Sequence, residues 1–230
     1  MTDVSGKRIL VTGATGALGS RIAQQLHAAG ATLVLTGTSP EKLQALGLPV
    51  ELYALDLSLP GAAASLIQTV TSVGQLDGIV AAHGVVAFGP VAELDAQTLQ
   101  QLQAINQTSP IELITSSIPT LSEAKTAGSE PFVVTISGVI ADMPTAGMAA
   151  YGASKAGLKA FVSAAQRELR REGIRIVDTR PPHTETGLAS RAIFGVAPAM
   201  PQGLDPDVVA ARIVAAIVND EKDVPAEAFS

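Results

Sequence analysis

Residues 8–19 read RILVTGATGALG, and they are the part of the sequence most indicative of its fold. It opens with a run of β-branched and leucine residues, which is typical of a buried strand. Glycines follow at positions 13, 16 and 19, where a segment of helical period begins. Glycines at such a turn let backbone N–H groups approach a pyrophosphate at the helix N-terminus. A tight structural turn is the simpler alternative, but the place between a first strand and a first helix favours dinucleotide binding.

The remaining sequence continues the alternation of short strands and longer helices. Strands are predicted over 8–12, 32–36, 50–54, 78–82, 132–136 and 174–179, and helices over 17–29, 40–47, 60–73, 94–118, 149–172 and 205–219. This alternation predicts an α/β fold, a single doubly wound Rossmann-type domain over 1–230 with a mostly parallel sheet and helices on both faces. A shortened seventh strand is expected within 222–229. Residues 120–130 are interpreted as a solvated connection, and residues 181–206 as a substrate lid or a surface excursion without function.

Composition narrows the classes of function. The formal net charge is −6 and no run of Lys or Arg stands out, so nucleic acid and anionic membrane surfaces are poor partners. The chain has no cysteine, and no His, Asp and Glu residues show metal-ligand spacing, so we predict no metal. No apolar stretch approaches the ~20 residues that cross a membrane. No signal peptide precedes the first strand either, and a cytoplasmic protein is expected.

Tyr151 and Lys155 form a second motif, in the stretch YGASK at the start of a helical segment. A spacing of four places both side chains on one face of a helix. The pKa of a free tyrosine is about 10, too high for efficient proton transfer near neutral pH, and a neighbouring ammonium group is expected to lower it. Tyr151 would then give a proton to a carbonyl or take one from an alcohol. The pair also arises by chance on exposed helices, but here it follows a Rossmann-type first half.

The end of the second predicted strand bears on the choice of cofactor. The stretch LTGTS has neither the acidic residue that binds the ribose 2′-hydroxyl of NAD nor an arginine for the 2′-phosphate of NADP. No acid there disfavours a phosphate, and Thr38, Ser39 and Lys42 offer hydrogen-bond donors. We therefore favour NADP(H) over NAD(H).

Together these motifs resemble the short-chain dehydrogenase/reductase family from about residue 5 to residue 220. The turn around Gly13 resembles the family's cofactor turn, and Asn106 matches its helix asparagine. The stretch AAHG at 81–84 stands in the place of the family's Asn-Asn-Ala-Gly, and 181–186 in that of Pro-Gly-x-x-x-Thr beside the nicotinamide. The resemblance implies cofactor binding by Gly13, Thr15, Gly16, Ala17, Leu18, Gly19, Thr38, Asp56, Leu57, Ala82, Gly84, Tyr151, Lys155, Pro181, Thr184 and Thr186.

The resemblance also implies an NAD(P)-dependent oxidoreductase that transfers hydride between the cofactor and a carbonyl/alcohol substrate. In that case Tyr151 is the catalytic acid/base, Lys155 also holds the nicotinamide ribose, Ser137 orients the substrate oxygen and Asn106 supports a proton relay. It further implies a homodimer or homotetramer through the helix that begins near Tyr151 and the preceding one. The scarcity of charge in 186–204 indicates an apolar or mixed substrate.

Several positions depart from the family pattern. In its commonest spacing the catalytic serine falls at Gly138, but members with one extra residue in this loop exist, so Ser137 remains the candidate. Pro182 replaces a glycine and stiffens the backbone beside the nicotinamide. These departures leave open a catalytically weak dinucleotide-binding protein with a regulatory or scaffolding role. An epimerase or dehydratase with the same Tyr–Lys pair is a third alternative, and it would purify with bound nucleotide.

Overall fold

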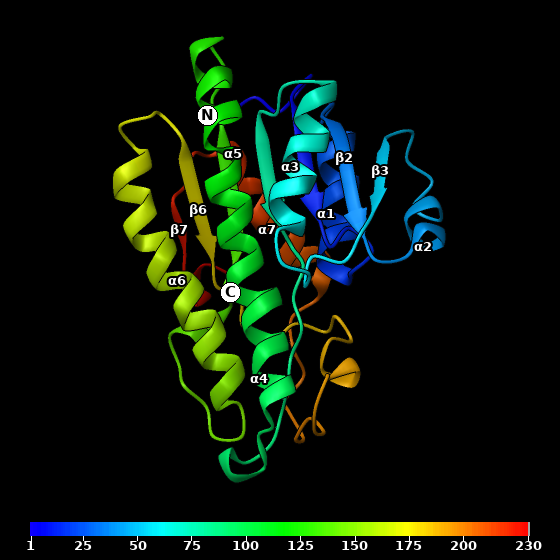
Figure 1. The fold of residues 1–230 in the computed structure, drawn as a ribbon, viewed down its shortest axis with the longest axis vertical. Coiled ribbons are helices and arrows are strands. Elements are labelled where there is room, and N and C mark those ends of the chain that lie inside the picture. Colours follow the sequence, from blue (N-terminus) through cyan, green and yellow to red (C-terminus); the bar gives the residue numbers. More distant parts are fainter. Residues whose placement is uncertain (230) are drawn as a thin grey trace.

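The computed structural model describes residues 1–229 and places one sheet of seven strands between two layers of helices (Figure 1). The strands are β1 (Arg8–Thr12), β2 (Thr32–Gly37), β3 (Glu51–Ala54), β4 (Gly78–Ala81), β5 (Phe132–Ile136), β6 (Arg175–Thr179) and β7 (Asp223–Val224). The α-helices are α1 (Ala17–Ala28), α2 (Pro40–Gln44), α3 (Ala62–Val73), α4 (Ala96–Gln103), α5 (Ser109–Thr126), α6 (Ala149–Leu169) and α7 (Pro206–Val218). The predicted α/β fold is confirmed.

The strands are parallel throughout, in the order β3-β2-β1-β4-β5-β6-β7. Val11 of β1 lies between Leu35 of β2 and Val80 of β4. The chain winds outward from β1 in both directions, so the carboxyl ends of β1 and β4 flank a topological switch point. Open α/β sheets bind their ligands in the crevice at this point.

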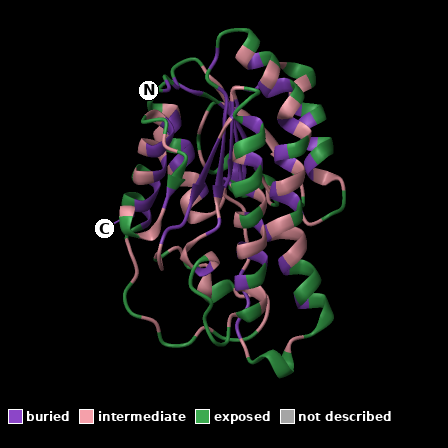
Figure 2. Cartoon of the chain, turned by 90° about the vertical axis from the view of Figure 1, so that its left-hand side faces the viewer, coloured by how far each residue is buried: buried purple, intermediate pink, exposed green. Residues whose placement is uncertain are grey.

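The helices bury both faces of the sheet. On one face α1 packs against α7, with Ile22 and Ile213 in the same buried cluster. On the other face α3, α5 and α6 contribute Leu66, Leu113 and Leu158 to a second cluster. Figure 2 shows the strands buried at the centre and the exposed residues on the outer sides of the helices. Both faces are covered, which explains why the strands read as continuous apolar runs without alternation.

The segment between β4 and β5 differs from the prediction. The single helix expected over 94–118 is in fact α4, a π-helical turn over Ala104–Thr108, and α5. α5 continues to Thr126, so the solvated connection predicted for 120–130 is wrong for most of its length. In the C-terminal part of α5, Leu121 and Ala124 are buried on the inner side of the helix, whereas its outer side is polar. That polar side, together with Pro119 inside the helix, gives the sequence the appearance of a loop.

Residues 181–206, which we call the lid segment, leave β6 and return at α7. Apart from a 3-10 turn over Ala189–Arg191 the segment has no helix, and Figure 1 shows it in orange at the carboxyl ends of the strands. Thr184 pairs with Leu204 at its base. Farther out, Ile193 N–H donates to the Val86 carbonyl (2.9 Å), and the Phe88 N–H donates to the Phe194 carbonyl (3.0 Å). Backbone hydrogen bonds thus attach the lid segment both at its base and to the chain that follows β4.

Candidate active site

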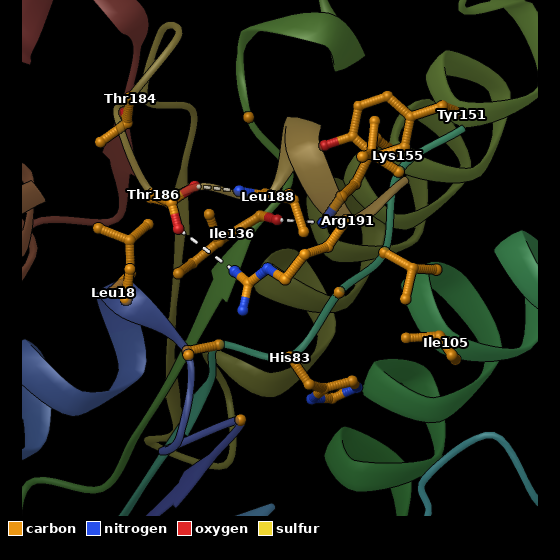
Figure 3. A pocket seen from close by; sticks show the side chains of 18 of the residues that line it. Leu18, His83, Ile105, Ile136, Tyr151, Lys155, Thr184, Thr186, Leu188 and Arg191 are labelled. Carbon is orange, nitrogen blue, oxygen red and sulfur yellow. Dashed lines mark hydrogen bonds between the residues drawn. The ribbon is translucent and has the colours of Figure 1, made fainter. Parts of the chain in front are cut away.

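A cavity of about 680 Å³ opens at the carboxyl ends of the central strands, at the switch point of the sheet. One side is formed by the glycine-rich turn and the ends of β2 and β3, the other by α6 and the lid segment (Figure 3). The predicted site residues that line it are Gly13, Thr15, Gly16, Ala17, Leu18, Thr38, Asp56, Leu57, Ala82, Gly84, Ser137, Tyr151, Lys155, Pro181, Thr184 and Thr186. Gly19 and Asn106 lie behind the wall of the cavity.

Close backbone packing shapes the glycine-rich turn. Gly13 has a φ of +66°, and a Cβ there would lie 2.7 Å from the Cα of His83. A Cβ on Gly19 would lie 2.2 Å from the carbonyl oxygen of Gly13, so α1 starts directly against the turn. No side chain caps α1 and its first turn carries no acidic residue. Its free N–H groups and positive dipole end therefore suit the diphosphate of a dinucleotide.

Tyr151 and Lys155 lie one helical turn apart on α6, and both side chains point into the cavity (Figure 3). Lys155 is only 6% exposed, and its Nζ donates to the backbone carbonyl of Ile136 at 2.8 Å. This bond joins α6 to the end of β5 and fixes the position of the ammonium group. The structure thus brings together the two side chains that sequence spacing had paired.

Burial moves the pKa values of this pair apart. Loss of water raises the pKa of Tyr151 to about 12. It also lowers the pKa of Lys155 to about 8, although the charge of Asp178 opposes that fall. This rise has desolvation of the phenol as its cause, whereas a lowering of the Tyr151 pKa by the Lys155 ammonium group stays a prediction. Tyr151 therefore keeps its proton at neutral pH, as a proton donor requires.

Asn106 braces the elements behind the cavity. It lies in the π-helical turn between α4 and α5 and is 1% exposed. Its Oδ1 accepts from Val85 N–H (3.0 Å), and its Nδ2 donates to the Val85 carbonyl (2.9 Å) and to Ser154 Oγ (3.1 Å). The side-chain amide is thus bound to the chain after β4 and to α6. A role for this turn in a proton relay stays a prediction.

Ser137 and Gly138 directly follow β5. The predicted role of Ser137, to orient the substrate oxygen, requires a free hydroxyl that faces the cavity. Ser137 is fully buried, and its hydroxyl donates to the carboxylate of Asp178 on β6. Gly138 follows at a φ of +73°, lines the cavity and offers no side chain. The proton of the Ser137 hydroxyl is therefore committed to Asp178 and is not free for a substrate oxygen.

The end of the cavity beside β2, where the resemblance implies the adenosine would lie, contains Thr38 and Asp56. Beside it, Ser39 caps α2 by accepting from Lys42 N–H at 3.2 Å, and its hydroxyl donates to Glu41 at 2.7 Å. This hydroxyl is therefore occupied. Of the donors predicted at this end, Thr38 is the one whose residue lines the cavity.

No sequence motif pointed to the residues that the lid segment and the neighbouring loops add to the cavity wall. Most are apolar and carry no motif: Val85, Val86, Phe88, Ile140, Met148, Leu188, Met200 and Pro201. Arg191 is a charged exception. Its Nε donates to the Gly187 carbonyl (3.1 Å) and its Nη2 to the Thr186 carbonyl (3.2 Å). These bonds hold two parts of the lid segment together (Figure 3).

A family model described as short chain dehydrogenase matches residues 7–193, most of the chain. The chain belongs to the short-chain dehydrogenase family. Members of this family are NAD(P)-dependent oxidoreductases, and the glycine-rich turn, the Tyr–Lys pair and the cavity between them lie in this protein where such an enzyme needs them.

Individual relatives of this short-chain dehydrogenase agree with the assignment. It is 25% identical to a 3-oxoacyl-(acyl-carrier-protein) reductase of Rickettsia conorii, over 96% of this chain and 92% of that protein. It is 31% identical to a hydroxysteroid 11-beta-dehydrogenase 1-like protein of Macaca fascicularis, over 77% of this chain and 63% of that one. A metagenomic short-chain oxidoreductase solved with NADP superposes with a TM-score of 0.80, at 29% identity over 97% of this chain and 98% of that chain.

Two features are absent from the described residues. Residues 1–229 contain no group of three or more His, Asp or Glu side chains that could hold a metal ion. None of the helices in the same range is both long and apolar enough to span a membrane.

Proposed function

We propose that this short-chain dehydrogenase reduces a carbonyl group to an alcohol, with Tyr151 as the proton donor and Lys155 as its partner. The position of Tyr151 on the wall of the cavity is the observation that supports this proposal most directly. It is a partly buried phenol that keeps its proton, on a cavity wall shared with Lys155, in the same cavity as a turn shaped for a diphosphate.

The residues divide the work between binding and proton transfer. The turn from Gly13 to Leu18 would hold the diphosphate of the cofactor, and Thr184 and Thr186 would border its nicotinamide. The nicotinamide, when bound, supplies the hydride. Tyr151 gives its proton to the oxygen on which negative charge develops, and the ammonium group of Lys155 stabilises the phenolate that remains.

NADP(H) is the cofactor that we favour over NAD(H). The end of β2 has Thr38 on the cavity wall and no acidic side chain among the lining residues from 36 to 38, so no carboxylate there opposes a 2′-phosphate. The similar metagenomic oxidoreductase was solved with NADP, which supports the same choice.

The substrate is proposed to be an apolar or mixed ketone or aldehyde. The wall beyond Tyr151 is built from side chains such as Ile140, Met148 and Leu188, which offer area for hydrophobic burial but few partners for polar groups. Arg191 is the charged exception, and its guanidinium is already bonded to backbone carbonyls of the lid segment.

A panel of carbonyl compounds tests this function. Oxidation of NADPH and of NADH is followed with neutral aliphatic, aromatic and bulky ketones and with size-matched keto acids. We expect turnover of neutral ketones, with a higher kcat/KM for NADPH than for NADH. A preference for keto acids would contradict the apolar substrate, and a preference for NADH would contradict the cofactor assignment.

The bound hydroxyl of Ser137 favours one second candidate, a dinucleotide-binding regulatory or scaffolding protein with little turnover. Such a protein binds NADPH but oxidises it with none of the panel. Binding and turnover measured on the same preparation separate the two functions.

A further inference from the structure

A buried ion pair lies beneath the proposed active site, at the carboxyl ends of β5 and β6. Asp178 is 2% exposed and Arg180 is 5% exposed, and Arg180 Nη1 donates to Asp178 Oδ2 at 3.0 Å. The other carboxylate oxygen, Oδ1, accepts from Thr135 Oγ1 at 2.9 Å and from the hydroxyl of Ser137. A buried charge is costly unless it is paired and hydrogen-bonded, and here both oxygens of the carboxylate are satisfied.

Arg180 connects this pair to two other parts of the site. It donates to both oxygens of Asp223 on β7, at 2.6 and 2.9 Å. Its Nε lies 2.6 Å from Asp142, which also pairs with Lys159 on α6. Asp142 belongs to the loop between β5 and α6 that leads to Tyr151. The arginine thus links β6, β7 and this loop around one buried guanidinium.

The same network is continuous with the backbone that binds Lys155. Ser137 follows Ile136, whose carbonyl accepts from Lys155 Nζ at 2.8 Å. The N–H groups of Ser137 and Gly138 both donate to the Thr179 carbonyl, at 3.0 and 3.2 Å. The Ile136 carbonyl and the Ser137 N–H belong to the same peptide group. A displacement of Ser137 would therefore also move the carbonyl that accepts from the ammonium group.

The charges that face Lys155 give the pair an electrostatic role as well. Tyr151, on the same helix, keeps its proton. His83, after β4, is partly buried, and desolvation lowers its pKa to about 3, so it is neutral. Asp178 supplies the negative charge that favours the protonated form of Lys155, against the desolvation that lowers the pKa of this lysine to about 8.

We propose that Asp178, Arg180 and Ser137 form a positioning unit that holds the Ile136 carbonyl against Lys155 Nζ and places a negative charge beneath that ammonium group. Ser137 then acts through Asp178 and does not touch the substrate. The effect of this unit on catalysis rests on the proposed function. Its effect on the position and the pKa of Lys155 does not.

The direct test is the titration of Lys155 by NMR of lysine labelled with ¹³C at Cε, in the full chain without substrate. The chain has six lysines, and Lys155→Arg identifies the resonance. In Asp178→Asn the midpoint should fall by about one pH unit below that of the wild type, since an opposing charge is removed. Asp223→Asn is the matched control, because it removes a carboxylate from the same arginine at a residue that is largely exposed, and it should leave the midpoint unchanged.

An unchanged midpoint in folded Asp178→Asn would overturn the proposal. The measurement needs no turnover, so it stands even if the carbonyl panel fails. If Asp178→Asn does not fold, Ser137→Ala takes its place. We expect the midpoint of Lys155 to fall in that variant too, because the Ile136 carbonyl is no longer held against the ammonium group. A loss in kcat of about 100-fold or more at unchanged Tm would place the hydroxyl on the substrate and overturn the assignment.

Discussion

At the scale of single residues, burial affects Tyr151 and Lys155 in opposite directions on the pKa scale. Each change disfavours the charged form, so at neutral pH the phenol holds its proton firmly and the ammonium group holds its own less firmly. Tyr151 therefore enters the reduction of a carbonyl in the protonated form, which is the form that can give up a proton. Oxidation of an alcohol requires a phenolate, which this environment makes costly.

The pH dependence of the reaction follows from these two values. Lys155 is charged below about 8 and neutral above it, whereas Tyr151 stays protonated up to about 12. We therefore predict that kcat/KM for ketone reduction is level between about pH 6 and 7.5 and falls as the pH rises through about 8. Initial rates in buffers of constant ionic strength measure this profile. A reduction rate that rises above pH 9 would contradict the assignment of Lys155.

Which residues the sequence reveals depends on how local their partners are. Tyr151 and Lys155 share one helical turn, so their spacing alone predicts that they meet. Asp178 and Ser137 are 41 positions apart, and a charged residue inside an apolar strand carries no sign of what it will bind. Only the register of β5 and β6 makes them neighbours. For the same reason the loss of a free Ser137 hydroxyl could not be predicted from the motif.

At the scale of elements, strands and turns were predicted better than the ends of helices. Glycine positions and apolar runs place β1, the first turn and α1 to within about a residue, because these signals are local. The division of α4 and α5 by a π-helical turn was not predicted. It depends on the bonds that Asn106 makes to Val85 and Ser154, which lie 21 and 48 positions away.

The turn between β1 and α1 yields a prediction about stability and binding. Ala at position 19 would place a Cβ 2.2 Å from the Gly13 carbonyl oxygen, whereas Ala at position 16 meets the same oxygen at 3.2 Å. Gly19→Ala should therefore lower the free energy of unfolding by about 1–3 kcal/mol or more and weaken NADPH binding. Gly16→Ala should do both to a smaller extent. Urea unfolding and fluorescence titration measure the two quantities, and the reverse order of effects would show that the packing is described wrongly.

At the scale of the whole molecule, alternation of strands and helices predicts the parallel sheet, but the position of the active site comes from the strand order. β1 and β4 become neighbours although 65 residues separate Thr12 from Gly78, and the cavity opens beside them. The lid segment was recognised by its prolines and its place after β6. The attachment of this segment to Val86 and Phe88 could not be predicted, because backbone hydrogen bonds between loops leave no pattern in the sequence.

Self-association is a prediction at this scale. Small side chains at Ala153, Ala160 and Ala164 are exposed along α6, and they would permit close packing against a second copy. We expect a dimer or tetramer in light scattering after size exclusion. Ala160→Glu should dissociate it, because a charge would be buried at the contact. Ala64→Glu, on the exposed side of α3, is the matched control and should not. A wild-type monomer at micromolar concentration would contradict this prediction.

The measurement that tests the central claim most directly compares Tyr151→Phe with Tyr53→Phe. These are the two tyrosines of the chain, and Tyr53 lies on β3, where its hydroxyl donates to Glu51 at 3.3 Å. With a ketone that the wild type reduces, we predict that Tyr151→Phe still binds NADPH but loses kcat by about 10²–10⁴-fold. Tyr53→Phe should keep both. Equal kcat in wild type and Tyr151→Phe would contradict the account, because the proton would then come from another group.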